Sequence, residues 1–229
     1  MRSRGPAPND HRLFGPTYTE AFREGTADLS WLLSRGYGAN AALQLVGNRY
    51  RLNARQQTAL GRMAAADAEV AARKEREIPV AAVRGQEVAI DGFNLLILLE
   101  NLLSGAYVFH CRDGTYRDIS SVHGSYKHVA ATRGAIIRVG EELQQLGAAA
   151  VHWYLDRPVS NSGRLLTLLY KIATERGFSW QVTLVDDPDK VLAVSPAVVV
   201  SSDGWILERA GRWFNLGAHL VGLIGGKVV

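Results

Sequence analysis

The sequence has only one cysteine and no long apolar run, and these absences exclude several classes of protein. Its 229 residues contain Cys111 alone, which excludes a disulfide framework and a zinc site built on cysteine pairs. A membrane-spanning helix needs roughly 20 apolar residues. The stretch 89–103 is shorter and contains Asp91 and Glu100. We therefore expect a cytoplasmic protein that does not enter a membrane.

The first 16 residues also lack the features of a signal peptide. Two arginines are followed by no apolar segment, and the stretch is rich in proline, glycine and asparagine. We expect residues 1–16 to form a flexible tail. The remaining composition, 47% hydrophobic and 21% charged, suits one medium or two small globular domains.

Positive charge is concentrated in the N-terminal third of the chain. Residues 1–79 hold 12 Lys and Arg against 8 Asp and Glu, a surplus of +4, whereas residues 80–229 hold 14 of each. Such a surplus suits contact with a polyanion such as nucleic acid. It is equally common on solvated helices, so both interpretations stay open.

Residues 17–79 show helical periodicity and no strand pattern, which predicts a basic helical domain. Asn53 and Gln56 have capping-box spacing and predict the start of one long helix that ends before Pro79. The short turns and basic residues of this region fit either a helix-turn-helix or a plain helical bundle. The basic residues concerned are Arg49, Arg51, Arg55 and Arg62.

From residue 80 onward, strand-like runs alternate with helical runs, which predicts an α/β domain over 80–229 with a mostly parallel sheet. One pair of runs reads instead as a hairpin, because Asp113-Gly114 between alternating residues fits a type I′ turn.

Four apolar runs in this domain end in aspartate: Asp91, Asp156, the pair Asp186 and Asp187, and Asp203. Parallel strands bring their carboxyl ends to one edge, where ligands bind. Carboxylates gathered there repel unless a cation neutralises them. Oxygen ligands select Mg²⁺ or Mn²⁺ over zinc.

Each aspartate also has a local explanation. Asp91 fits a helix cap, and Asp156 fits a turn before Arg157-Pro158. Asp186, Asp187 and Asp189 surround Pro188 and fit a loop. Asp203-Gly204 fits a hairpin turn. These alternatives stay open at this stage.

Other polar groups lie near the predicted edge. Asn94, one helical turn after Asp91, could bond a phosphate or a water. Glu100 lies in an apolar helix and needs a partner, either a metal or a core arginine. The predicted helix that begins near Ser160 could bind phosphate at its N-terminus, although ordinary capping also explains its serines. The residues concerned are Arg157, Ser160, Ser162 and Arg164.

The motif "AIDGFNLL", with its later strand-end aspartates, is similar to the PIN-like and NYN nuclease superfamily. That resemblance implies a Rossmann-like α/β fold and metal roles for Asp91, Asp156 and Asp203, with Asp187 next. It also implies RNA as the partner and a bound Mg²⁺ or Mn²⁺. Over residues 11–224 the chain resembles the domain-of-unknown-function 434 family, through motifs such as "IDGFNLLILLENLLSG", "LDRPVSNSGRL" and "VVVSSDGWIL".

Two segments depart from a plain PIN domain. The hairpin and "RDISSVHGSYK" read as an insertion, which adds four possible site neighbours: Asp113, Arg117, Asp118 and Lys127. The segment "SSDGWILERAG" reads as continuing strand, where many such nucleases begin a helix.

The leading hypothesis is a metal-dependent ribonuclease acting on structured RNA. Arg157 and Lys190 would offset phosphate charge, while Asn94 and Ser202 would position water or substrate. The alternatives are an inactive PIN-like protein that binds RNA or acts as a scaffold, and a phosphatase that uses the same acidic edge on small esters. The sequence does not indicate an oligomeric state.

Overall fold

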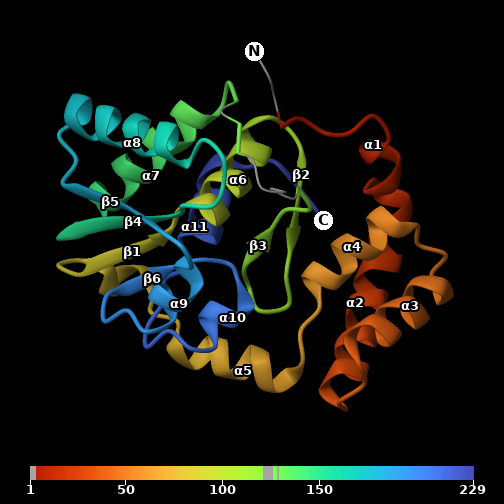
Figure 1. Ribbon diagram of the computed structural model, residues 1–229. Coiled ribbons are helices and arrows are strands. Elements are labelled where there is room, and N and C mark those ends of the chain that lie inside the picture. Colours follow the sequence, from red (N-terminus) through yellow and green to blue (C-terminus); the bar gives the residue numbers. More distant parts are fainter. Residues whose placement is uncertain (1–3, 121–125, 128) are drawn as a thin grey trace.

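The computed structural model describes residues 4–120, 126–127 and 129–229. A helical region lies beside an α/β region, and a short hairpin lies between them (Figure 1). No helix in this described part of the chain has the length and apolar character needed to cross a bilayer.

The helical region packs around Phe22, Leu29, Val46 and Leu60, which are all buried. The predicted capping box is confirmed, because Gln56 N–H donates to Asn53 and the Gln56 side chain accepts from Asn53 N–H. The elements are α1 (Asp10–Leu13), the 3-10 turn η1 (Pro16–Tyr18), α2 (Thr19–Ser34), α3 (Ala39–Arg49), α4 (Ala54–Met63), α5 (Asp67–Arg76) and the 3-10 turn η2 (Val80–Val83).

The single long helix expected after Asn53 is wrong, since the chain forms α4 and α5 with a break between them. At the break, Ala65 N–H donates to the Ser30 hydroxyl and Ala65 C=O accepts from Arg112. Glu69 then accepts from Ala66 N–H. Tertiary hydrogen bonds therefore replace helical ones at a point where the sequence has no helix breaker.

The expected flexible tail is also different in the structure. Residues 10–13 form α1, whose Asp10 is buried and pairs with Arg55, with 2.7 Å between Arg55 Nε and Asp10 Oδ1. Phe14 is buried beside Phe22 and Phe109. The buried Asp10 carboxylate, paired with the exposed Arg55, and the buried Phe14 ring fix the segment against the helical region.

The α/β region contains a four-stranded sheet with the order β5-β4-β1-β6, and all three pairings are parallel. The predicted parallel sheet is therefore confirmed (Figure 1). The remaining elements are β1 (Glu87–Asp91), α6 (Gly92–Leu103), β2 (Tyr107–His110), β3 (Tyr116–Arg117), α7 (Thr132–Gln145), β4 (Ala150–Asp156), α8 (Ser162–Arg176), β5 (Trp180–Val185), α9 (Pro188–Ala193), β6 (Val198–Val200), α10 (Gly204–Leu207), α11 (Leu216–Ile224) and β7 (Lys227–Val228).

Alternating side chains of the central strand β1 enter two separate cores. Val88 and Ile90 lie in the large core with residues of α6, α7 and α8, whereas Ala89 lies in a smaller core with residues of α9 and α10. Because both faces of β1 are covered, its residues read as a continuous apolar run. The carboxyl end of this buried strand is where Asp91 lies.

The predicted hairpin is confirmed, but its turn is not type I′. β2 pairs antiparallel with β3, and only Gly114 of the central pair has a positive φ, 79°. A type I′ turn needs positive φ at both positions. The Asp113 carboxylate instead accepts from Thr115 N–H and Thr115 Oγ1, which closes a longer loop. The C-terminal strand β7, which the sequence did not indicate, pairs with β2.

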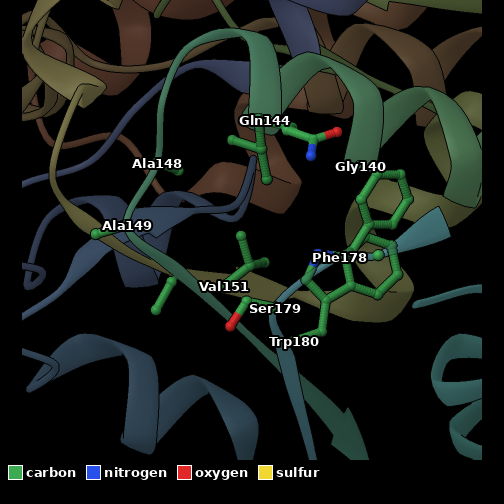
Figure 2. A pocket seen from close by; sticks show the side chains of 11 residues that line it. Gly140, Gln144, Ala148, Ala149, Val151, Phe178, Ser179 and Trp180 are labelled. Atoms are coloured by element: carbon green, nitrogen blue, oxygen red, sulfur yellow. The ribbon is translucent and has the colours of Figure 1, made fainter. Parts of the chain in front are cut away.

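A pocket of about 150 Å³ lies at the amino ends of β4 and β5. None of the described residues that line it has an ionisable side chain. Figure 2 shows the Phe178 ring beside Gly140 and Trp180. The pocket is at the opposite end of these strands from the aspartates, so it has no part in the acidic site.

The close contact between α7 and Phe178 leads us to predict how two glycine substitutions on α7 change the stability of the protein. A Cβ atom at Gly140 would lie 2.2 Å from Phe178 Cε2, whereas a Cβ at Gly134 on the same helix would meet nothing within 4 Å. We expect Gly140→Ala to lower the free energy of unfolding by about 1–3 kcal/mol through overpacking. Gly134→Ala should raise it by roughly 0.5 kcal/mol through lower backbone entropy in the unfolded chain.

Urea denaturation of both variants measures the two effects on one helix. A Gly140→Ala variant as stable as Gly134→Ala would contradict the close packing of Phe178 on α7.

Candidate active site

The strand-end aspartates lie along one edge of the sheet, as the sequence predicts. Asp91 and Asp156 are the last residues of β1 and β4. Asp187 follows β5, and Asp203 follows β6 after two serines. Because all four strands run parallel, these positions share the carboxyl edge.

Asp91 is 7% exposed and has two roles in the structure. Its Oδ1 accepts from Asn94 N–H at 3.4 Å, which caps α6, and its Oδ2 accepts from Ser201 Oγ at 2.8 Å. The glycine after it is required, because a Cβ at Gly92 would lie 2.9 Å from the Tyr154 carbonyl oxygen. The helix-cap interpretation of Asp91 is therefore confirmed, and it coexists with a place on the acidic edge.

The carboxylates at the edge interact electrostatically. The pKa of Asp91 is raised to about 7, mainly by burial; the hydrogen bond from Ser201 opposes this shift, and the charges of Asp189 and Asp156 add to it. Burial and the charge of Asp187 raise the pKa of Asp156. Burial and the charges of Asp203, Asp156 and Asp187 raise the pKa of Asp189.

Asp189 is the site residue that the sequence did not single out. The aspartates around Pro188 read from sequence as a loop, but Pro188 starts α9 and Asp189 lies in the first turn of this helix. From this position the charge of Asp189 raises the pKa of Asp91. The charges of Asp203, Asp156 and Asp187 in turn raise the pKa of Asp189. The dense run of three aspartates at 186–189 was the available signal.

Asp187 and its neighbour Asp186 are partly neutralised by basic side chains. Asp187 caps α9 through Lys190 N–H and pairs with Lys190 Nζ at 2.8 Å, and this lysine holds the pKa of Asp187 below its ordinary value. Asp186 pairs with Arg157 at 3.2 Å, and both side chains are exposed. The two cations expected to offset phosphate charge thus lie at the rim and pair with carboxylates.

The loop after β6 is joined to α6 through Asn94. Asn94 Oδ1 accepts from both Ser202 N–H at 2.9 Å and Ser202 Oγ at 2.8 Å. Asp203 then caps α10 by accepting from Trp205 N–H at 2.8 Å. The expectation that this segment continues as a strand is wrong, because the Asp203 cap starts a helix. One of the two departures from the nuclease pattern therefore disappears.

Within residues 4–120, 126–127 and 129–229, no three carboxylate, imidazole or thiol groups are placed so that they could hold a metal between them. The carboxylates of Asp91, Asp187 and Asp203 are each engaged in capping a helix. The donor chemistry nevertheless fits a hard cation, since the groups are oxygen ligands whose mutual repulsion a cation would relieve. Mg²⁺ commonly binds through one or two carboxylates plus waters and substrate phosphate, without a full protein cage.

The hairpin residues form a buried network beside the edge. Arg117 donates to the Ser202 carbonyl oxygen at 2.7 Å and to Asp113 at 2.5 Å, and Arg73 of α5 donates to the same Asp113 oxygen at 2.7 Å. Asp118 accepts from Ser120 N–H, and burial raises the pKa of its carboxyl group. Lys127 is exposed.

Glu100 belongs to a different cluster. Its carboxylate is fully buried, pairs with Arg4 Nε at 2.5 Å, and accepts from the Tyr126 and Thr132 hydroxyls. Of the two interpretations left open, the structure shows the ion pair with an arginine.

The start of α8 has no serine cap. Asn161, with a φ of 72°, precedes the helix and donates to the Tyr126 carbonyl oxygen. The buried Ser162 donates to the Arg157 carbonyl oxygen at 3.4 Å. Ser160 and Arg164 are exposed, and the Ser160 carbonyl oxygen accepts from Tyr126 N–H. The expected cap near Ser160 is therefore wrong.

The raised pKa of Asp91 makes stability depend on pH. Below about pH 4 its carboxyl is protonated in both states. Between about pH 4 and pH 7 the unfolded chain releases this proton while the folded chain keeps it, so the free energy of unfolding falls as pH rises, and the loss persists above pH 7. We expect Asp91→Asn to raise the Tm at about pH 8, and to change it little near pH 4.

Calorimetry at the two pH values measures this difference. For a chain of this size each kcal/mol shifts the Tm by about 2–4 °C. An equal effect of the substitution at both pH values would contradict the raised pKa.

Comparison with known proteins places the chain in a family. Residues 80–219 match the family described as "Domain of unknown function (DUF5616)". The chain belongs to this family. Residues 21–76 match "Protein of unknown function (DUF434)". The uncharacterised protein MJ0935 of Methanocaldococcus jannaschii is 32% identical over 182 residues, which cover 77% of this chain and 87% of that protein. No solved structure matches the chain.

Both family descriptions and the relative's name state no activity. A function for this chain therefore has to be argued from the residues of the site. The DUF5616 match covers β1 through part of α11, including all the strand-end aspartates. The DUF434 match covers α2 through α5, except the first residues of α2.

Proposed function

We propose that this DUF5616 protein is a PIN-like, NYN-like nuclease that hydrolyses RNA with the help of Mg²⁺ or Mn²⁺. The observation that carries the proposal is the row of aspartates at the carboxyl edge of a parallel sheet, where each acts electrostatically on its neighbours. Perturbed carboxylates gathered at such an edge are typical of functional sites.

One or two of the carboxylates of Asp91, Asp156, Asp189 and Asp203 would hold the cation, with waters as its other ligands and Asp187 nearby. When bound, such an ion activates water and stabilises charge on a phosphodiester. Other side chains of the protein position the carboxylates and reduce the negative charge at the edge. Ser201 orients the Asp91 carboxylate by donating to it, and Asn94 fixes the loop that bears Asp203. Arg157 and Lys190 lower the net negative charge that an approaching phosphate meets.

One observation favours a second candidate, an inactive PIN-like protein that binds RNA. Asp91, Asp187 and Asp203 each cap a helix, so structure alone accounts for part of the aspartate pattern.

Incubation of the protein with end-labelled structured RNA and Mn²⁺ tests the proposal. Cleavage that stops on addition of a chelator supports the nuclease. Binding without cleavage supports the second candidate. Hydrolysis of nitrophenyl phosphate with intact RNA would show a phosphatase at the same edge.

A further inference from the structure

The last turn of α4 brings one arginine of the helical region to the acidic edge. Arg62 lines a cavity of about 110 Å³ together with Asn94, Asp118, Ser202 and Asp203. The cavity therefore lies where the helical region, the hairpin and the loop after β6 meet.

The position of this turn is fixed by a buried guanidinium. Arg117 donates through Nη1 to the Arg62 carbonyl oxygen at 2.9 Å, and through Nε to the Ser202 carbonyl oxygen at 2.7 Å. Arg112 N–H also donates to the Met63 carbonyl oxygen at 2.8 Å. The backbone of Arg62 is thus held at a set distance from the loop that bears Asp203.

Arg62 carries a charge that acts on the Asp118 carboxyl, where it opposes the rise in pKa that burial causes. Its side chain is exposed, and it has no hydrogen bond or ion pair within the part of the chain that the structure describes. The neighbouring basic groups differ, because Arg117 pairs with Asp113, Arg157 with Asp186, and Lys190 with Asp187.

A second donor faces the same cavity. Asn94 uses its Oδ1 for both hydrogen bonds to Ser202, and its amide NH₂ donates to no other described residue. The cavity also holds two carboxylates, those of Asp118 and Asp203. A phosphate entering it would be repelled by these carboxylates and attracted by a guanidinium beside them.

We propose that Arg62 binds a backbone phosphate of the RNA substrate in this cavity, with the Asn94 amide as a second donor. This inference rests on the proposed function for its substrate class. A guanidinium can hold two phosphate oxygens at once. The helical region thereby contributes a substrate contact to the site, which gives its basic surplus a defined location.

The test measures binding in the absence of cleavage. A fluorescent single-stranded RNA of about ten nucleotides is titrated with the full chain in the presence of a chelator, at several salt concentrations, and anisotropy is recorded. The variants are Arg62→Ala, Arg62→Lys and Arg138→Ala. Arg138 is an exposed arginine of α7 that has no ion pair among the described residues, so its removal controls for net charge.

We expect Arg62→Ala to weaken binding about tenfold, and to reduce the slope of log affinity against log salt by about 0.7, the value for one phosphate contact on a single strand. Arg62→Lys should keep the slope, and Arg138→Ala should match the wild type. Inorganic phosphate should compete with RNA for the wild type and compete less for Arg62→Ala. Each variant keeps the backbone carbonyl of residue 62 that accepts from Arg117, so we expect all of them to fold. Circular dichroism checks this expectation.

The two proposals fail in different ways. Equal affinities and slopes for Arg62→Ala and Arg138→Ala would overturn the inference, even if the wild type cleaves RNA. Absence of RNA binding by the wild type would overturn it as well. A specific loss in Arg62→Ala, with no cleavage under any metal condition, would support the inference and refute the nuclease.

Discussion

Asp91→Asn should reduce Mn²⁺-dependent cleavage of RNA at least about a hundredfold, comparable to the loss of one key electrostatic group in an active site. Asp91 is the last residue of the central strand, and the charges of Asp156 and Asp189 act on it. Asparagine keeps one oxygen that can accept from Asn94 N–H, and its NH₂ can donate to the Ser201 hydroxyl oxygen, so the fold and the helix cap persist. What is lost is the negative charge that would attract the cation.

A control for this prediction exists at the rim of the same edge. Asp186 is exposed and pairs with Arg157, so Asp186→Asn removes the same charge without changing the central carboxylates. We expect its initial cleavage rate to stay within about twofold of the wild type. Equal rates for Asp91→Asn and the wild type would remove Asp91 from the mechanism. Equal losses in both variants would show a general charge effect.

Asp113→Ala should lower the free energy of unfolding by about 3–5 kcal/mol. The Asp113 side chain is fully buried and pairs with both Arg73 and Arg117, whose side chains are 8% and 10% exposed. Removal of the carboxylate leaves two buried guanidinium groups without their shared partner. Because Arg73 belongs to α5 and Arg117 contacts Ser202, the loss also loosens the helical region from the acidic edge.

Urea denaturation measures this effect, and Asp67→Ala is its control. Asp67 pairs with Arg112, but its side chain is 70% exposed, so its loss should cost less than about 1 kcal/mol. Equal effects of the two substitutions would contradict the importance of the buried network.

The pH dependence of Asp113 has the opposite sign to that of Asp91. Burial by itself would raise the pKa of Asp113, but Arg117 and Thr115 together hold that pKa below its ordinary value. Its stabilising contribution is therefore present above about pH 4 and is lost as pH falls through the lower, folded-state pKa. The difference between wild type and Asp113→Ala should shrink in strong acid.

The sheet and its acidic edge could be predicted because their signals are local. Apolar runs that end in aspartate and alternate with helical periods specify parallel strands, and parallel strands have one common edge. The positions of Asp91 and Asp156 at that edge can be predicted from this pattern. The sequence also predicts Asn94 near the site, and in the structure Asn94 accepts a hydrogen bond from Ser202 N–H.

Other features depend on contacts between distant segments, which no local pattern reports. The break between α4 and α5 depends on Ser30 and Arg112. The partner of Glu100 is Arg4, which is 96 residues away. Asp189 faces the edge because α9 begins at Pro188, and a short helix after a proline reads from sequence as a loop. The position of Arg62 beside Asp203 depends on the hairpin that lies between them.

The central claim is that the carboxyl edge holds a divalent cation. Titration of the protein with Mn²⁺ at about pH 6.5, followed by electron paramagnetic resonance, tests it most directly. We expect saturable binding that Mg²⁺ displaces, with proton release because Asp91 has a pKa of about 7. Binding should weaken strongly in Asp91→Asn and remain in Asp186→Asn. No saturable binding, or equal binding by wild type and Asp91→Asn, would contradict the account.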